Sequence, residues 1–372
     1  MAEHTNGPVR VLHVVTNMSY GGLENLLMNY YRSIDRSRIQ FDFLTHVDIH
    51  QDFEEEIAAL GGRLYRLPRL NPFSYGYLRR LDSFFREHPE YRVVHCHLNC
   101  MSSVVLKAAM DNGVPARIAH SHGSSHRWDL KYPIRLWCRG RIPRYASALF
   151  ACGKAAGDWM FQGKTYTVIP NAIDAAAFRI NEAVAARMRR ELGVEGKFVV
   201  GHVGQFRTEK NHLFLIDVFA ALLNLVPESR LILVGKGTQM EPCRQKADQL
   251  GIGEKILFLG ARADIPELMQ AMDVFLLPST TEGLPVTMVE AQSAGLPCVI
   301  SDGVPIECKL TEEVIQLPLA ESAQRWAEVL KGYLEYEKAD RYDAIVKAGF
   351  DVCTNVRWLE NYYLTAHNGE TL

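Results

Sequence analysis

The sequence predicts an α/β protein built from two doubly wound parallel sheets, and three observations lead to this fold class. Short apolar runs alternate with segments whose apolar residues recur at helical spacing, and the connections between them are short. The alternation begins at residue 9 and starts again near residue 198, after a junction around 170–180. The chain has 372 residues, enough for two such domains. We therefore expect an N-terminal domain over 1–170 and a C-terminal domain over 171–351.

Composition narrows the class of protein. Hydrophobic residues make up 48% of the chain and charged residues 23%, as in soluble globular proteins. The net charge of -2 gives no overall basic field, so we expect no nucleic-acid partner. The 8 cysteines form no C-x-x-C pair, which favours reduced thiols and a cytoplasmic protein. No apolar run approaches the roughly 20 residues that span a bilayer, so any membrane contact would be peripheral.

The stretch 271–302 contains the central motif. An apolar strand is predicted over 273–277, a helix over 285–294 and a second strand over 297–301. Glu282 lies in the loop before the helix and Glu290 lies within it. Such a strand–loop–helix–strand unit is how a parallel sheet holds a ligand at the carboxyl end of a strand.

The chemistry of this unit suggests a sugar nucleotide. The start of a helix offers free N–H groups and a partial positive charge, which suit a phosphate. A carboxylate only accepts hydrogen bonds, so Glu282 and Glu290 suit the hydroxyls of a sugar or a ribose. The alternative is that both are ordinary glutamates on a solvated helix.

The spacing of Glu282 and Glu290 resembles the E-x7-E motif of the retaining GT-B glycosyltransferases of family 4. The resemblance extends to G-G-x-E at 21–24, to VIPNAIDAAAF at 168–178 and to GQFRTEKNH at 204–212. It covers nearly the whole chain and is more specific in the second half. It implies two Rossmann-like domains facing a central cleft, an acceptor-binding first domain and a nucleotide-sugar-binding second one. It also implies that the final helix, within 352–372, crosses back to the first domain.

Roles for individual residues follow from the resemblance. Lys210 and, less directly, Arg207 would grip the donor diphosphate, because Gln205 stands where the family has an arginine. Glu290 would hold the ribose hydroxyls and Glu282 the donor sugar. The implied catalytic residues are His122, Lys210 and Glu282. The implied donor-binding residues are Gly21, Gly22, Arg207, Lys210, Gly235, Gly237, Glu282, Gly283, Leu284 and Glu290.

Two histidine pairs end predicted strands, His95 with His97 and His120 with His122. Residues i and i+2 of a strand share a face, so a zinc site drawn from these histidines with Cys96 or Cys100 is one interpretation, and polar closure of strand ends is another. The family has a sugar-contacting histidine in the segment that includes His122. The resemblance therefore favours His122, with His120 as the second choice, and no metal ligand.

The segment 124–145 carries arginines interleaved with aromatic residues. Cations and aromatics at this spacing suit anionic lipid or a pyrophosphate-bearing acceptor, or else an ordinary surface helix whose arginines reach into solvent. Arg127, Arg135 and Arg139 are the candidate acceptor or membrane contacts.

The implied reaction moves a sugar from a nucleotide-diphosphate sugar, UDP-linked in our expectation, to a hydroxyl with retention at the anomeric carbon. The acceptor would be a lipid-linked saccharide in cell-surface polysaccharide biosynthesis, at the inner face of the plasma membrane. We expect no cofactor and no metal. A sugar-nucleotide 2-epimerase of the same fold and a catalytically impaired binding partner remain as alternatives. A nicotinamide-dependent oxidoreductase is disfavoured, because no G-x-G-x-x-G follows the first strand.

Overall fold

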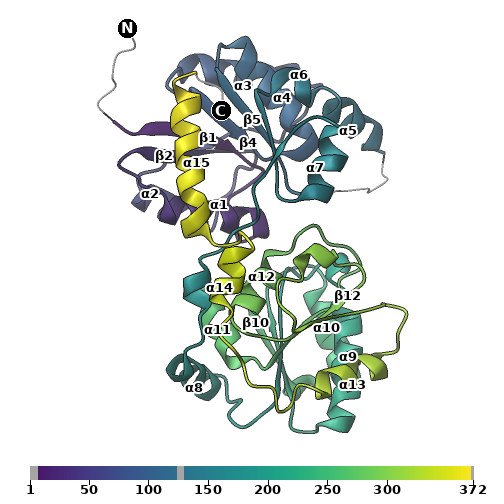
Figure 1. The fold of residues 1–372 in the computed structure, drawn as a ribbon. Helices are drawn as coiled ribbons and strands as arrows, with labels where there is room; N and C mark the ends of the chain where they lie inside the picture. The colour runs from purple at the N-terminus through teal and green to yellow at the C-terminus, as the bar shows by residue number, and fades with distance from the viewer. Residues whose placement is uncertain (1–6, 124–129, 370–372) are drawn as a thin grey trace. The chain divides into compact units, whose positions relative to one another are not determined.

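The computed structural model describes residues 7–123 and 130–369. The chain divides into two compact units (Figure 1). Unit 1 comprises Met1–Asn171 together with Val352–Leu372, and unit 2 comprises Ala172–Asp351. Within the described ranges, no helix is both long and apolar enough to cross a membrane.

Unit 1 is organised on a parallel sheet of 7 strands in the order β3-β2-β1-β4-β5-β6-β7. The strands are β1 (Val9–Val14), β2 (Ile39–Thr45), β3 (Leu64–Arg66), β4 (Val93–Cys96), β5 (Ala116–Ser121), β6 (Ala148–Ala151) and β7 (Thr167–Val168). The helices are α1 (Gly22–Ser33), α2 (Glu54–Ala59), α3 (Tyr75–Glu87), α4 (Ser102–Asp111), α5 (Tyr132–Arg139), α6 (Ile142–Tyr145), α7 (Lys154–Phe161) and α15 (Val352–His367), with a 3-10 turn η1 (Asn99–Met101). The sheet order steps outward from β1 in both directions, as in doubly wound folds.

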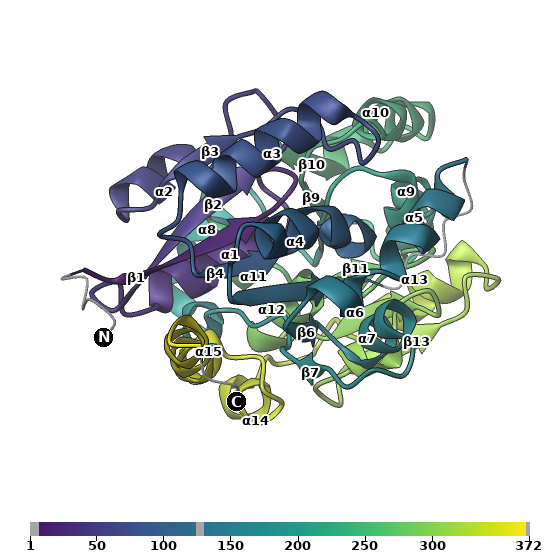
Figure 2. The same ribbon diagram turned by 90° about the horizontal axis from the view of Figure 1, so that it is seen from above.

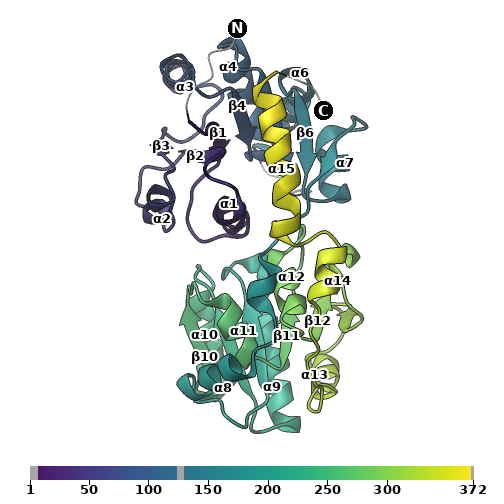
Figure 3. The same ribbon diagram turned by 60° about the vertical axis from the view of Figure 1, so that its left-hand side comes forward.

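Alternation along β1 decides which helices cover which face of this sheet. Leu12 and Val14 point into an apolar cluster shared with α3 and α4. His13 points to the opposite face, where Tyr363 of α15 lies. Figure 2 shows α3 and α15 on opposite sides of the strands, and Figure 3 shows α15 beside the first unit's sheet. The last helix is therefore part of unit 1.

Unit 2 contains a second parallel sheet, of 6 strands in the order β10-β9-β8-β11-β12-β13. The strands are β8 (Val199–Val203), β9 (Arg230–Val234), β10 (Ile256–Gly260), β11 (Val274–Leu277), β12 (Cys298–Ser301) and β13 (Val314–Leu317). The helices are α8 (Glu182–Glu191), α9 (His212–Leu225), α10 (Met240–Gln249), α11 (Ile265–Ala271), α12 (Val286–Ser293), α13 (Ala323–Lys331) and α14 (Tyr342–Lys347). The 3-10 turns are η2 (Ala175–Phe178), η3 (Thr208–Lys210), η4 (Gly253–Lys255) and η5 (Ile306–Cys308).

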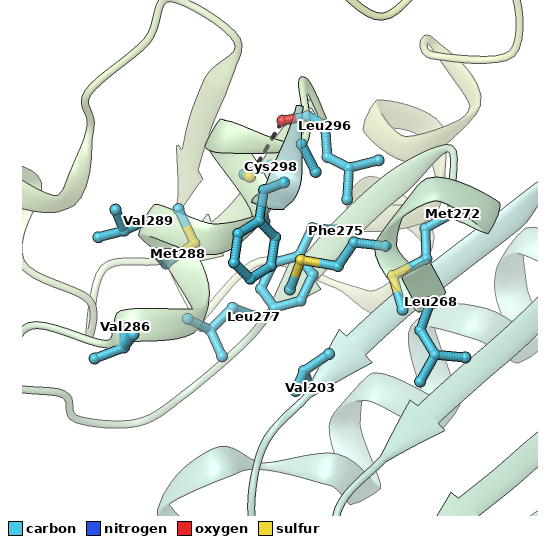
Figure 4. Close-up of a cluster of buried hydrophobic side chains, with 14 of the residues drawn as sticks. Val203, Leu268, Met272, Phe275, Leu277, Val286, Met288, Val289, Leu296 and Cys298 are labelled. Carbon is cyan, nitrogen blue, oxygen red and sulfur yellow. Dashed lines mark hydrogen bonds between the residues drawn. The ribbon is translucent and has the colours of Figure 1, made fainter. Parts of the chain in front are cut away.

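The core of unit 2 fixes the position of α12. Phe275 and Leu277 of β11 are fully buried and pack with Met288 of α12 (Figure 4). Apolar burial of this kind stabilises the fold but does not by itself fix the position of a helix along its axis. Hydrogen bonds of the Gln292 side chain fix that position, because its Nε2 donates to Cys308 O at 2.8 Å and its Oε1 accepts from Leu310 N at 2.8 Å. The loop and helix around the two glutamates therefore lie on a rigid support.

Four elements differ from the sequence-based expectation. The helix α10 was not predicted, because only Cys243 and Ala247 of it are buried and the apolar period is weak. The edge strand β13 was also not predicted. Helical spacing in the sequence also predicts a helix over 320–336, whereas α13 spans only Ala323–Lys331 and ends before Gly332. Helical spacing of apolar residues in the sequence predicts the final helix over 355–366, whereas α15 is longer and spans Val352–His367.

Candidate functional site

The loops after β8 and β11 meet at one edge of the second sheet. The two strands are parallel neighbours, so their carboxyl ends lie together. Thr280 N, after β11, donates to the carbonyl of Glu209 in η3 at 2.8 Å. Glu282 N donates to Gly303 O at 3.0 Å. These backbone bonds bring two of the predicted residues, Lys210 and Glu282, to one place.

The side chains of Lys210 and Glu282 form an ion pair. The Nζ of Lys210 lies 2.6 Å from Oε1 of Glu282, and the side chains are 18% and 12% exposed. This approach does not satisfy the angles of a hydrogen bond, and Oε1 has no hydrogen-bond partner among the described residues. The contact is thus an electrostatic pairing in a nearly dry place, where the two charges compensate each other.

Glu290 lies on α12 in different surroundings. Its side chain is nine-tenths buried, and burial raises the pKa of the carboxyl from 4.5 to about 7. No side-chain partner for this carboxyl occurs within the described part of the chain. A buried carboxyl without a partner is costly to ionise, so it is suited to a ligand that brings hydroxyl donors.

The glycine loop after β9 is held against the loop after β8. Gly235 has a φ of +143°, and a Cβ built there would lie 2.0 Å from Gly204 O. Gly237 has a φ of +155°, with a Cβ 2.3 Å from Phe206 O. Both glycines are therefore required by the close approach of two backbones. This is a structural reason for them that the sequence did not reveal.

The remaining predicted donor residues of unit 2 lie around this edge. Arg207 is exposed, and its backbone N donates to Gln205 O at 2.7 Å. Gly283 is exposed in the turn before α12, whereas Leu284 packs partly against the core. The helix begins at Val286 after Pro285, and no side chain of the described residues caps it. Met288 N donates to Pro285 O at 3.0 Å, so the N–H groups of Val286 and Thr287 are the ones that remain for another acceptor.

In unit 1 the structure brings five histidines together. His13 and His95 are partners in the register of β1 and β4, and the rings of His95 and His97 lie 4.2 Å apart. The rings of His120 and His122 are stacked at 4.1 Å. Burial lowers the pKa of all five imidazoles, so the cluster is neutral. No local pattern in the sequence connects His13 with the two later pairs, because His13 lies far from them along the chain.

The nitrogens of this cluster pair with one another. His97 Nδ1 lies 2.8 Å from His122 Nε2, and His13 Nδ1 lies 3.0 Å from His97 Nε2. Ligands on one tetrahedral zinc would stand about 3.3 Å apart with each lone pair aimed at the metal. Here the lone pairs face the neighbouring rings, as in hydrogen bonds. Two groups of three histidines have ring nitrogens within 4.8 Å of one another, His13 with His95 and His97, and His97 with His120 and His122. The geometry of both groups fits hydrogen-bonded imidazoles better than ligands of one zinc ion.

Gly21 and Gly22 precede and begin α1. Gly21 is the N-cap residue with a φ of -166°, an extended conformation open to any residue. A Cβ built on Gly22 would meet no atom within 4 Å. The fold therefore does not demand a glycine at position 22, and the backbone conformation does not demand one at position 21, in contrast to Gly235 and Gly237.

The basic segment is largely engaged in local packing. Arg139 lies over the ring of Trp159 at 4.8 Å and donates to its carbonyl at 3.1 Å. Arg135 lies over Tyr132 at 5.8 Å. Arg127 lies outside the described residues. The exposed apolar side chains here are Leu130, Trp137 and Phe73, the last two with ring centroids 6.4 Å apart.

Two parallel-sheet Rossmann-like units define the GT-B class of fold. A family model described as glycosyl transferases group 1 matches residues 184–349, and one described as glycosyltransferase family 4 matches residues 20–177. EpsF of Bacillus subtilis, described as a candidate glycosyltransferase, is 35% identical over 376 residues, covering 95% of this chain and 96% of EpsF. The chain therefore belongs to the family 4 type of glycosyltransferases.

Two further relatives resemble the chain. An Escherichia coli UDP-Gal:alpha-D-GlcNAc-diphosphoundecaprenol alpha-1,3-galactosyltransferase is 28% identical, covering 57% of this chain and 58% of that protein. The crystal structure of Anabaena HepE in complex with UDP-glucose superposes with a TM-score of 0.80 at 23% identity, covering 96% of this chain and 99% of that one. At this identity the likeness to HepE shows the fold alone.

Proposed function

We propose that this glycosyltransferase moves a sugar from a UDP-sugar to a hydroxyl of a lipid-linked saccharide, with retention and without a metal, in polysaccharide biosynthesis. The observation that carries the proposal is the Lys210–Glu282 ion pair beside the uncapped start of α12. The donor named for the Escherichia coli relative and the ligand of HepE support the choice of UDP. The diphosphoundecaprenol acceptor of the former supports a lipid-linked acceptor.

Each residue has a role in this proposal. Lys210 and the first N–H groups of α12 stabilise the negative charge on the departing diphosphate. Glu282 leaves Lys210 and accepts from the donor sugar, and Glu290 accepts from the ribose hydroxyls. Arg207 is exposed and adds positive charge near the diphosphate. Gly21 and Gly22, at the start of α1, allow a ligand to approach the backbone closely.

His122 contacts the donor sugar in this proposal, and the reaction needs no metal because Lys210 and the helix start neutralise the leaving group. No protein nucleophile is required when the acceptor attacks the same face that the diphosphate leaves, with the diphosphate taking the acceptor proton. The exposed Phe73, Leu130 and Trp137 form the surface of unit 1 that would rest on lipid near the acceptor.

A transfer assay with a panel of UDP-sugars and short polyprenyl-diphosphate saccharides tests the proposal. We expect one donor to yield a product that keeps the donor's anomeric configuration by NMR, at an undiminished rate in excess EDTA. Lys210→Ala should abolish turnover, whereas Lys331→Ala, at an exposed lysine of α13, should leave it unchanged. An inverted product or loss of activity in EDTA would contradict the mechanism.

The epimerase alternative has a separate outcome in the same assay. An epimerase would release a modified sugar and free UDP from the donor alone, with no acceptor present. An impaired binding partner would bind UDP without consuming any donor in the panel. Transfer that depends on an added saccharide acceptor excludes both.

A further inference from the structure

Three histidines of unit 1 form one chain of hydrogen bonds across three neighbouring strands. The chain runs from His13 on β1 through His97, just after β4, to His122, just after β5. His13 Nδ1 lies 3.0 Å from His97 Nε2, and His97 Nδ1 lies 2.8 Å from His122 Nε2. A neutral imidazole has one donor and one acceptor, so the proton positions of the three rings are coupled.

The buried end of the chain decides its direction. His13 Nε2 is fully buried and has no hydrogen-bond partner among the described residues. It borders a cavity of about 20 Å³ whose lining includes Leu27, Phe41 and Leu359. A buried N–H without an acceptor is rarer and costlier than a buried acceptor without a donor. The proton of His13 therefore belongs on Nδ1, from which it donates to His97.

The same order of donor and acceptor then continues from His97 to His122. His97 accepts at Nε2, so its proton is on Nδ1, from which it donates to His122 Nε2. His122 accepts at Nε2, so its proton is on Nδ1, the nitrogen that the chain leaves for another contact. The backbone of His122 is fixed as well, because its N–H donates to Asn99 Oδ1 at 3.0 Å.

We propose that His97 and His13 are positioning residues that hold His122 as the Nδ1–H tautomer, so that His122 donates a hydrogen bond to a hydroxyl oxygen of the sugar donor. The contact with the sugar rests on the proposed function, whereas the tautomer rests only on the geometry of unit 1. An N–H at Nδ1 of His122 favours a sugar group that can accept a hydrogen bond, such as a hydroxyl oxygen, over a group that can only donate one.

A second imidazole pair provides a matched control. His95 Nε2 lies 3.1 Å from His120 Nδ1, and His95 Nδ1 lies 2.6 Å from the Tyr363 hydroxyl. His95 is as buried as His97, and the two rings lie 4.2 Å apart. Among the described residues, no hydrogen bond joins the His95–His120 pair to His13, His97 or His122. A change at His95 thus disturbs the same cluster and leaves the chain to His122 intact.

Long-range 15N–1H NMR on histidine-labelled protein reads the tautomer directly. The expected spectrum has His122 protonated at Nδ1 and unprotonated at Nε2. An Nε2–H tautomer in the wild type would overturn the proposal. So would stoichiometric zinc in the purified protein, because a metal would take the lone pairs that the chain uses.

Two amide substitutions at His97 separate positioning from mere packing. The amide nitrogen of asparagine lies at the position of Nδ1 and that of glutamine at the position of Nε2. We expect His97→Asn to keep the Nδ1–H tautomer of His122 and to keep kcat/KM within a few-fold. His97→Gln should yield a mixture of tautomers and a loss of about tenfold or more in kcat/KM, by analogy with the loss when a partner that orients a metal-binding histidine is removed.

The experiments separate the positioning of His122 by His13 and His97 from the proposed sugar transfer. His95→Gln should lower stability and leave the tautomer of His122 unchanged. If His97→Gln alters the tautomer while no sugar transfer is found for any variant, the positioning chain stands and the proposed function fails. If His97→Asn and His97→Gln give the same tautomer as the wild type, the proposal is overturned whatever the activity.

Discussion

The ammonium nitrogen of Lys210 lies 2.6 Å from a carboxylate oxygen of Glu282, and both side chains are less than one-fifth exposed. Each charge therefore has a partner before any substrate arrives. A diphosphate that takes Lys210 must displace the carboxylate, which is then available to accept from a sugar hydroxyl. The pair explains how one small site accommodates a phosphate and a hydroxyl next to each other.

Removal of the charge of Glu282 should strengthen the binding of UDP. In Glu282→Gln the ammonium of Lys210 no longer has a competing carboxylate, so the diphosphate meets an uncompensated cation. We expect the Kd for UDP to fall a few-fold in isothermal titration, while sugar transfer falls by about tenfold or more. Weaker UDP binding in this variant would show that Glu282 itself holds the nucleotide.

Glu290 should make stability depend on pH in a defined direction. Its folded pKa of about 7 exceeds the unfolded value of 4.5, so the folded state binds the extra proton between these values. Stability from this group is present below pH 4.5 and is lost as pH rises through 7. Glu290→Gln should therefore stabilise the free protein by up to about 3 kcal/mol at pH 8 and by little at pH 4.5. Urea unfolding at both pH values checks this, and equal effects would contradict it.

UDP binding should release protons near pH 7. Ribose hydroxyls that donate to Glu290 favour its charged form and lower its pKa in the complex. Titrations of UDP at pH 7 in buffers of different ionisation enthalpy should show release of part of a proton per site. The release should disappear in Glu290→Gln. Proton uptake, or a release that persists in the variant, would place the titrating group elsewhere.

Gly235 should tolerate no side chain. A Cβ there would lie 2.0 Å from Gly204 O at a φ of +143°. Gly235→Ala should destabilise the protein by about 2 kcal/mol or more. Gly76→Ala is the control, because a Cβ in that helix would meet its nearest atom, Ser74 Oγ, at 3.9 Å. Equal stability of the two variants would show that the two loops can separate without cost.

The histidine cluster should destabilise the protein in acid. Burial lowers the pKa of His13 and of His122 to about 3, and the unfolded rings titrate at 6.5. As pH falls below 6.5, the histidines of the unfolded chain bind protons and those of the folded cluster do not. The free energy of unfolding therefore falls by about 1.4 kcal/mol per pH unit for each ring. The thermal midpoint should therefore drop between pH 7 and 5, and less steeply in His95→Gln. A midpoint that rises would contradict a neutral cluster.

The two-sheet fold could be predicted from the sequence for a physical reason. Strand period, helix period and turn residues are local, and the order of strands in doubly wound sheets follows from short right-handed connections. The roles of Lys210 and Glu282 came from the family resemblance, and the structure places both residues after neighbouring parallel strands, β8 and β11, at one edge of the sheet.

Other features depend on contacts that no local pattern contains. His13 meets His97 only because β1 and β4 are neighbours although 84 residues separate the two histidines. The helix α10 has too few buried residues for a clear period. Arg139 is part of a basic stretch in the sequence, but the fold places it against Trp159.

Titration of UDP and of uridine into the wild type and Lys210→Ala shows whether Lys210 holds the diphosphate, because the two ligands differ only in the diphosphate. We expect Lys210→Ala to weaken UDP binding by about tenfold or more and to leave uridine binding unchanged. If Lys210→Ala weakens both ligands equally, or neither, Lys210 does not hold the diphosphate and the proposed donor site is wrong.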